Sequence, residues 1–146
     1  MRYIEIAKAE GAKLVYGGTV PTDPALQGGS YVEPTVFAEV SQDMINANEK
    51  VFGPVLSVIK WSGEKATLEP VNRVEYGLTA AIFTKDLARA HHAAGHVQSG
   101  FILVINARPH FLGASYGGYK QSGIGREKSI EELLSFAQIK NINITL

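Results

Sequence analysis

The segment YGGYKQSGIGRE, residues 116–127, combines four glycines with cationic and hydroxyl-bearing side chains. Glycine-rich turns that lead into a helix can hold a phosphate group through their backbone N–H groups. Gly118 and Gly123 have the interval of a P-loop, but Ile124 stands where that motif requires lysine. The run from Gly123 to Gly125 also lacks the third glycine of a dinucleotide-binding fingerprint. The residues therefore exclude both phosphate motifs and predict a loop with another use.

Candidate nucleophiles are scarce. The chain contains no cysteine, which removes a thiolate nucleophile and any thiolate metal site. Ser115 and Ser122 lie in the loop region with no evident histidine base beside them in the sequence. Because an alcohol needs such a base to become a nucleophile, we expect both serines to be structural.

Two histidines have a spacing that could bind metal. His92 and His96 are four residues apart, the interval at which two helical imidazoles can share a zinc ion. No glutamate lies between them, and no further ligand is suggested by the sequence, so we predict no metal site. His91 and His110 are single histidines in a predicted helix and a predicted loop, and we assign no chemistry to them.

The composition indicates an ordinary globular chain. It has 146 residues, of which 45% are hydrophobic and 19% charged, enough for one domain with a core. The 14 basic and 14 acidic side chains cancel, so neither nucleic acid nor an anionic membrane is indicated as a partner. No apolar run approaches the ~20 residues of a membrane span, and the first residues lack a signal-peptide core, so we expect a cytoplasmic protein.

The first half of the chain predicts short elements. Residues 3–10 read as a helix that ends at Gly11, and residues 12–18 as a strand. Strand character returns at residues 31–40 and again in the apolar run 51–61. The polar stretch between the first two strands contains prolines and glycines, which is typical of a surface connection.

The second half has a clearer pattern. Residues 77–84 and 101–106 read as apolar strands, and between them residues 86–97 form a helix capped by Asp86. Weak helical character precedes them at residues 68–74. Two strands that are buried on both faces and joined by a helix indicate a parallel βαβ unit.

After Asn106 we expect a loop of about twenty residues, and loops of that length in compact domains are usually either functional or disordered. The residues SIEE, from Ser129 to Glu132, predict a capping box for a helix with Leu133, Leu134 and Phe136. The alternating residues 142–146 predict a final strand. The predicted parallel sheet is preceded only by the last turns of a helix, and we therefore expect these elements to be part of a larger fold.

Three blocks of sequence carry a resemblance: KVFGPVLSVIKW (50–61), EYGLTAAIFTKDLARAHHAA (75–94) and YGGYKQSGIGRE (116–127). In this order they resemble the C-terminal part of the NAD(P)-dependent aldehyde dehydrogenases. Together with GGTVPTDPALQGGSYVEPTVF (17–37), they are most similar to the betaine-aldehyde and amino-aldehyde branch.

The resemblance implies an α/β fold over the whole chain. Residues 1–139 would form part of a parallel-sheet catalytic domain, and residues 140–146 an oligomerisation strand. The partners it implies are further copies of the chain or a full-length or complementary aldehyde dehydrogenase subunit.

The resemblance also implies roles for single residues. In the family the aromatic residue before the two glycines, here Tyr116, helps to wall the substrate pocket. The family has two glutamates before the Phe-Gly-Pro block, and the second accepts hydrogen bonds from the nicotinamide ribose. Glu49 fills the first place, but Lys50 fills the second, and an ammonium group can only donate. Phe52 matches the aromatic residue on the nicotinamide side, and the alternative is a core phenylalanine beside the apolar run that follows it.

The catalytic residues of the family are not found in this sequence. Its reaction needs a cysteine thiolate, a glutamate base and a dinucleotide-binding domain that holds NAD or NADP. We therefore assign no catalytic residue and expect neither cofactor binding nor turnover by this chain alone. The function expected is that of a C-terminal fragment from a truncated or split enzyme, whose parent reaction oxidises an aldehyde, plausibly betaine aldehyde or another amino-aldehyde. The alternative is a non-catalytic interaction module, or the product of a decaying gene.

Overall fold

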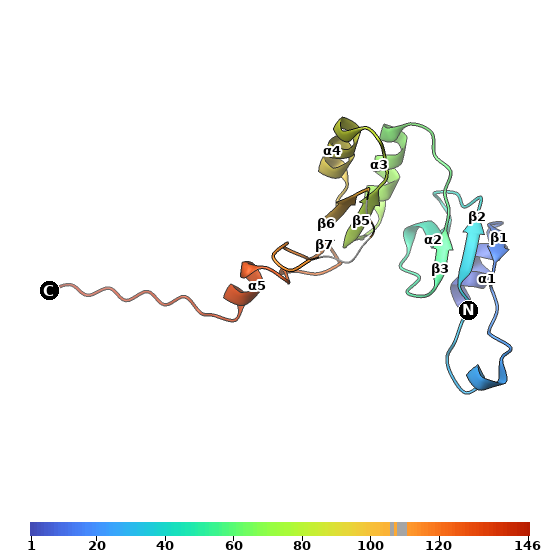
Figure 1. Ribbon diagram of the computed structural model, residues 1–146, viewed down its shortest axis with the longest axis horizontal. Coiled ribbons are helices and arrows are strands. Elements are labelled where there is room, and N and C mark those ends of the chain that lie inside the picture. The colour runs from blue at the N-terminus through green and yellow to red at the C-terminus, as the bar shows by residue number, and fades with distance from the viewer. Residues whose placement is uncertain (106, 108–110) are drawn as a thin grey trace. The chain divides into compact units, whose positions relative to one another are not determined.

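The computed structural model describes residues 1–105, 107 and 111–146, which form two compact units, Met1–Glu75 and Tyr76–Leu146. The described residues of the first unit form one three-stranded sheet and those of the second form two two-stranded sheets, and each unit is described by itself (Figure 1). Within the described residues, no helix is long and apolar enough to cross a membrane.

The first unit is built on a three-stranded sheet in the order β1-β2-β3. Strand β2 is antiparallel to β1 and parallel to β3, with Val36 opposite Leu56 in the parallel pair. The elements in chain order are α1 (Arg2–Ala9), β1 (Lys13–Tyr16), η1 (Pro24–Leu26), β2 (Thr35–Ala38), α2 (Ile45–Asn48), β3 (Val55–Ser57) and α3 (Glu64–Arg73).

The core of this unit forms where α1 packs against the sheet. Ile4 and Ala7, three residues apart on one face of α1, are fully buried together with Phe37 of β2. The predicted helix at residues 3–10 is thus confirmed, and Gly11 follows it with a φ of 90°, which suits glycine at a helix end.

The second unit contains the predicted parallel pair. Strand β5 (Thr79–Ile82) runs parallel to β6 (Phe101–Val104), and α4 (Leu87–His96) connects them (Figure 1). The Asp86 carboxylate caps α4 by accepting from the Arg89 N–H group at 3.1 Å, as the sequence predicts. The short strands β4 (Tyr76–Gly77) and β7 (Tyr119–Lys120) pair antiparallel, and α5 (Ile130–Ser135) follows them.

Three expectations about these elements need correction. Strand β5 is not buried on both faces, because exposed and half-buried residues alternate along it in this chain. The weak helix expected at residues 68–74 is α3, which begins earlier, at Glu64, and contains Pro70. The strand predicted at residues 101–106 ends at Val104, and Asn106 lies outside the described residues.

The capping box at α5 was also predicted wrongly in its detail. Ser129 is the N-cap residue, but its hydroxyl makes no capping hydrogen bond and instead bonds the Glu131 carboxylate. The Glu132 carboxylate accepts from the Lys128 N–H group at 2.5 Å, one residue before the expected partner. The hydrogen bond from Ser129 holds the pKa of Glu131 below its usual value.

The last residues form no regular element within this chain. Residues 138–146 contain neither helix nor strand, and the strand expected at residues 142–146 is absent from the structure (Figure 1). A strand needs a neighbour for its backbone hydrogen bonds, and no described segment of the chain pairs with these residues. Their role in oligomerisation therefore stays a prediction.

Candidate functional site

The turn before β3 presents an aromatic ring to solvent. Phe52 has a φ of 50°, which is rare for a bulky residue, and 88% of its surface is exposed. The backbone on its C-terminal side is fixed, because Val55 N–H donates to Gly53 O at 2.8 Å and Thr35 N–H donates to Pro54 O at 2.8 Å. The fold thus holds the ring outward although the conformation is costly.

A cation accompanies this ring. The Lys50 ammonium lies 5.0 Å from the centroid of the Phe52 ring, within the range of a cation–π contact. The neighbouring Glu49 carboxylate accepts a hydrogen bond from the Tyr3 hydroxyl of α1 at 2.9 Å. The turn therefore exposes Phe52 with a positive charge beside it, and Glu49 is held toward α1.

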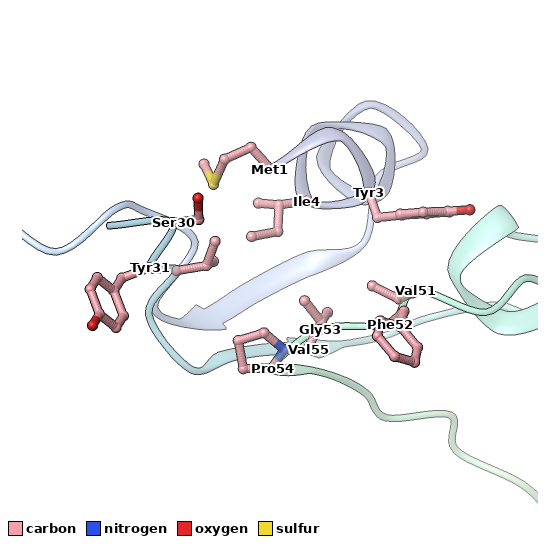
Figure 2. Close-up of a pocket in the computed structure, with 11 residues that line it drawn as sticks. Met1, Tyr3, Ile4, Ser30, Tyr31, Val51, Phe52, Gly53, Pro54 and Val55 are labelled. Atoms are coloured by element: carbon pink, nitrogen blue, oxygen red, sulfur yellow. The ribbon is translucent and has the colours of Figure 1, made fainter. Parts of the chain in front are cut away.

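A hollow of about 390 Å³ adjoins this turn, and three segments of the first unit line it (Figure 2). They are the start of α1, residues 30–32, and the turn with the start of β3. The side chains in Figure 2 are mostly apolar, with hydroxyl groups from Tyr3, Ser30 and Tyr31. Such a lining can hold an apolar ring with polar edges, but it supplies no acid–base pair.

The glycine-rich segment is closed on itself. Tyr116 and Glu127 exchange two backbone hydrogen bonds, of 3.0 and 2.7 Å, which join the two ends of the segment. Inside it, Ser122 N–H donates to Tyr119 O at 3.1 Å. The Ser122 hydroxyl also accepts from the Gly77 N–H group of β4 at 2.9 Å and so links the segment to that strand.

The glycines permit close packing of backbone on backbone. A Cβ atom added to Gly100 would lie 1.9 Å from the Gly117 carbonyl oxygen, and one added to Gly117 would lie 2.6 Å from that of Gly125. A Cβ atom on Gly118 would lie 2.4 Å from Ser122 Cβ. These distances are far below van der Waals contact, so only glycine fits at these positions.

The Arg126 side chain links two turns of the glycine-rich segment. Its Nη1 atom donates to the carbonyl oxygens of Gly125, at 2.6 Å, and Gly118, at 3.2 Å. Its guanidinium carbon lies 5.8 Å from the centroid of the Tyr119 ring. The guanidinium thus satisfies two carbonyl groups of a glycine-rich turn that would otherwise need water.

Tyr116 is half-buried at the start of this segment. Its ring meets Phe101 of β6 edge to face, with centroids 5.5 Å apart, and the Lys128 ammonium lies 5.1 Å from its centroid. The ring helps to line a second hollow, of about 350 Å³, between the glycine-rich segment and α5. Its lining carries charges of both signs, from Arg126, Glu127 and Glu132.

The two histidines with metal-binding spacing lie together on α4. The rings of His92 and His96 lie with centroids 4.2 Å apart, and His96 Nδ1 is 2.7 Å from the His92 carbonyl oxygen. No group of three or more possible metal ligands exists among the described residues. His110 lies outside the described residues, and the Ser115 hydroxyl oxygen accepts from the Ser129 hydroxyl at 3.5 Å.

The β5–α4–β6 unit and the parallel β2–β3 pair define an α/β protein with pieces of parallel sheet. The profile of the family described as "Aldehyde dehydrogenase family" matches residues 1–142. The chain belongs to the aldehyde dehydrogenase family.

Curated relatives agree with this assignment. The chain is 48% identical to aldehyde dehydrogenase tropH of Talaromyces stipitatus and 43% identical to a betaine aldehyde dehydrogenase of Brucella anthropi. Each match covers 100% of this chain but 29% and 30%, respectively, of the relative. The chain thus spans about 30% of the length of these proteins.

Solved structures give the same result for the fold. The chain is 38% identical to betaine aldehyde dehydrogenase from Staphylococcus aureus, with a TM-score of 0.86 over 92% of this chain and 27% of that one. It is 37% identical to an indole-3-acetaldehyde dehydrogenase of P. syringae, with a TM-score of 0.90 over 99% and 29%. That second structure is a complex with NAD⁺ and IAA.

The structure adds two residues to those that the sequence suggested. Lys128 and Arg126 both contact aromatic rings or carbonyls of the glycine-rich segment, and neither role could be predicted from spacing. The predicted residues fall into the two units: Lys50 and Phe52 lie together on the turn of the first, and Tyr116 lies in the second.

Proposed function

We propose that this chain supplies the C-terminal part of an NAD(P)-dependent aldehyde dehydrogenase, an enzyme that oxidises an aldehyde to its carboxylate. Betaine aldehyde and related amino-aldehydes are the substrates that we propose to test first. The observation that carries the proposal is the family match over residues 1–142, together with NAD⁺ in solved relatives. All the relatives named above are dehydrogenases, so the alternative of a non-catalytic module has no support.

The chain would contribute binding surfaces rather than reacting groups. It contains no cysteine, so it cannot provide the thiolate that attacks the aldehyde. Tyr116 would form part of the substrate wall, because its ring lines a hollow and is fixed by the backbone pair with Glu127. Nucleophile and base would come from polypeptide that this sequence does not include.

The cofactor residues fit NAD or NADP only in part. The exposed ring of Phe52 offers a flat apolar surface beside a hollow, as a nicotinamide would require. Lys50 does not fit, since its ammonium cannot accept hydrogen bonds from ribose hydroxyls and would repel the cationic nicotinamide. We therefore assign no step of the reaction to a cofactor held by this chain alone.

Residues 140–146 would pair with a second aldehyde dehydrogenase subunit. Ile142, Ile144 and Leu146 alternate along this segment and are largely exposed, which suits a strand that is added to another sheet. A homo-oligomer and a complex with a full-length subunit both satisfy this requirement.

The proposal is tested by an exchange between chains. The corresponding C-terminal segment of a full-length betaine aldehyde dehydrogenase is replaced by these 146 residues, and NAD(P)H formation is followed with betaine aldehyde and with propanal. We expect turnover by the exchanged enzyme and none by the isolated chain, because the exchanged enzyme retains the cysteine. A loss of turnover in an exchanged enzyme that folds and still binds NAD⁺ would contradict the proposal.

A further inference from the structure

We propose that His92 and His96 form a two-imidazole site for a divalent transition-metal ion on the exposed side of α4. Their spacing alone predicts no such site, because the sequence suggests no further ligand. The structure adds the positions of both rings and a hydrogen bond that sets where one of them carries its proton. Neither histidine lines the hollows described above, so the inference is independent of the proposed dehydrogenase function.

Both side chains lie on the outward side of a helix that is held at its two ends. Ala90 is 1% exposed and marks the inward side of α4. At 3.6 residues per turn, His92 and His96 lie about 200° and about 240° around the helix axis from Ala90, and both are exposed. A side-chain cap fixes the first turn, and the Val97 N–H group makes a 2.9 Å hydrogen bond just beyond His96. The backbone thus presents both imidazoles to solvent from fixed positions.

The two rings are close enough to share one ion. Their centroids lie 4.2 Å apart, and their planes are tilted by 34°. Two imidazole nitrogens that bind one ion at about 2.0 to 2.1 Å lie roughly 3.3 Å from each other in a tetrahedral arrangement. The observed separation of the rings is compatible with this spacing, so an ion can join them without a change in the helix.

The hydrogen bond of His96 decides which of its nitrogens can bind metal. Nδ1 of His96 is 2.7 Å from the His92 carbonyl oxygen, and a carbonyl oxygen only accepts, so Nδ1 carries the proton. In the neutral ring the lone pair is then on Nε2. A metal-bound imidazole almost always donates its other N–H group to a carbonyl, a carboxylate or water, which orients the ring and raises its basicity. His96 makes the hydrogen bond that this role requires.

The chemistry of the two ligands selects the ion. Imidazole suits copper, nickel and zinc, whereas magnesium and calcium take oxygen ligands. For a given nitrogen site, Cu²⁺ binds more tightly than either Ni²⁺ or Zn²⁺. The described residues contain no group of three or more possible ligands, so solvent would complete the coordination of an ion held by this pair. Such a site is open and exchangeable, unlike a structural zinc centre with four protein ligands.

The experiment uses the intact chain without an affinity tag, and Zn²⁺, Ni²⁺ and Cu²⁺ as probes, with Mg²⁺ as the control ion. Calorimetry measures the dissociation constants, and NMR follows the imidazole protons during the Zn²⁺ titration. The variants are His92→Ala and His96→Ala. His91→Ala is the matched control, because it removes an exposed imidazole of the same helix that does not face either partner.

We expect the ring signals of His92 and His96 to shift together with Zn²⁺, and Cu²⁺ to bind most tightly. Loss of a supporting hydrogen bond to a metal ligand weakens binding about 10- to 100-fold, so loss of either ligand should weaken it at least about tenfold. His91→Ala should leave the affinity unchanged.

Metal binding should also stabilise the helix that carries the pair. At a free Zn²⁺ concentration of about a hundred times the dissociation constant, amide exchange that requires opening of α4 should slow about a hundredfold. The same concentration of Zn²⁺ should have no such effect in His96→Ala. Equal weakening by His91→Ala and His92→Ala, or equal affinity for Mg²⁺ and Zn²⁺, would overturn the inference.

Discussion

Single residues decide how this chain departs from the motifs it resembles. At position 50 a cation stands where the resemblance implies a carboxylate, and the structure places that cation beside the exposed ring of Phe52. The adjacent Glu49 cannot replace the missing carboxylate without giving up its hydrogen bond from Tyr3. Cofactor affinity should therefore depend on the charge at position 50.

In the full-length enzyme that carries these 146 residues as its C-terminal part, Lys50→Glu should lower the apparent Michaelis constant for NAD⁺ about tenfold or more. Hydrogen bonds to a charged acceptor contribute about 1.5 to 3 kcal/mol, and about 1.36 kcal/mol is a factor of ten. Steady-state titrations with NAD⁺ measure the effect. Lys60→Glu changes the charge equally at an exposed position and should have little effect. Identical constants for the two variants would show that residue 50 makes no contact with the ribose.

At the scale of elements, glycine spacing is explained by packing between segments. Gly100, just before β6, packs against the Gly117 carbonyl group, and Gly77 of β4 packs against the Gln98 carbonyl group. A Cβ atom at either glycine would overlap the facing carbonyl oxygen, at 1.9 and 2.0 Å, respectively. The glycine-rich segment is thus joined to the β5–α4–β6 unit by backbone contacts, and this fixes where Tyr116 lies.

Gly100→Ala should destabilise the second unit by about 3 kcal/mol or more, because the new Cβ atom would overlap a carbonyl oxygen that is held by other backbone contacts. Gly95→Ala is the control: an added Cβ atom at this position in α4 would meet no other group within 4 Å, and the change should stabilise by about 0.5 to 1 kcal/mol. Denaturant unfolding, monitored by amide exchange in β5 and β6, measures both. A similar stability for the two variants is the result that contradicts this explanation.

The two helix N-termini of the second unit should respond differently to mutation. Asp86→Ala removes a capping acceptor from α4 and should lower the free energy of unfolding by about 0.5 to 2 kcal/mol. Ser129→Ala at α5 should cost less, because the Ser129 hydroxyl caps no N–H group there. Amide exchange of the first turn of each helix tests the difference. A greater loss of stability in Ser129→Ala than in Asp86→Ala would argue against the observed hydrogen bonds.

At the scale of the whole molecule, many apolar side chains of both units are exposed. They include Phe83, Leu133 and Phe136, each more than 60% exposed, and the alternating residues of the C-terminal segment. Exposed strands and apolar surface of this kind favour association with other chains. We expect the isolated chain to self-associate.

Deletion of residues 140–146 should lower the mean mass of this association, because it removes the strand that we propose pairs with a second chain. Sedimentation over a wide range of concentration measures the mass, with Ile142→Asp and Ile144→Asp as a milder version of the deletion. Replacement of Asn141 and Asn143 by serine, polar for polar, should leave the mass unchanged. A compact monomer at every concentration would be incompatible with the role proposed for this segment.

The sequence by itself determined the features that depend on neighbours along the chain. Local hydrophobic spacing and capping chemistry predict the β5–α4–β6 unit, the Asp86 cap and the helix at the N-terminus. The motif blocks led to the correct family. Residues 142–146 form no strand within this chain, since the hydrogen bonds of a strand need a partner that no described segment of this chain supplies.

Only the tertiary structure decided which distant groups meet. The contact of Lys128 with Tyr116, the Arg126 bonds to Gly118 and Gly125, and the shift of the Glu132 carboxylate to Lys128 N–H have no signature in spacing. Each depends on how the chain turns back on itself, which is set by packing of the whole unit rather than by the residues beside it.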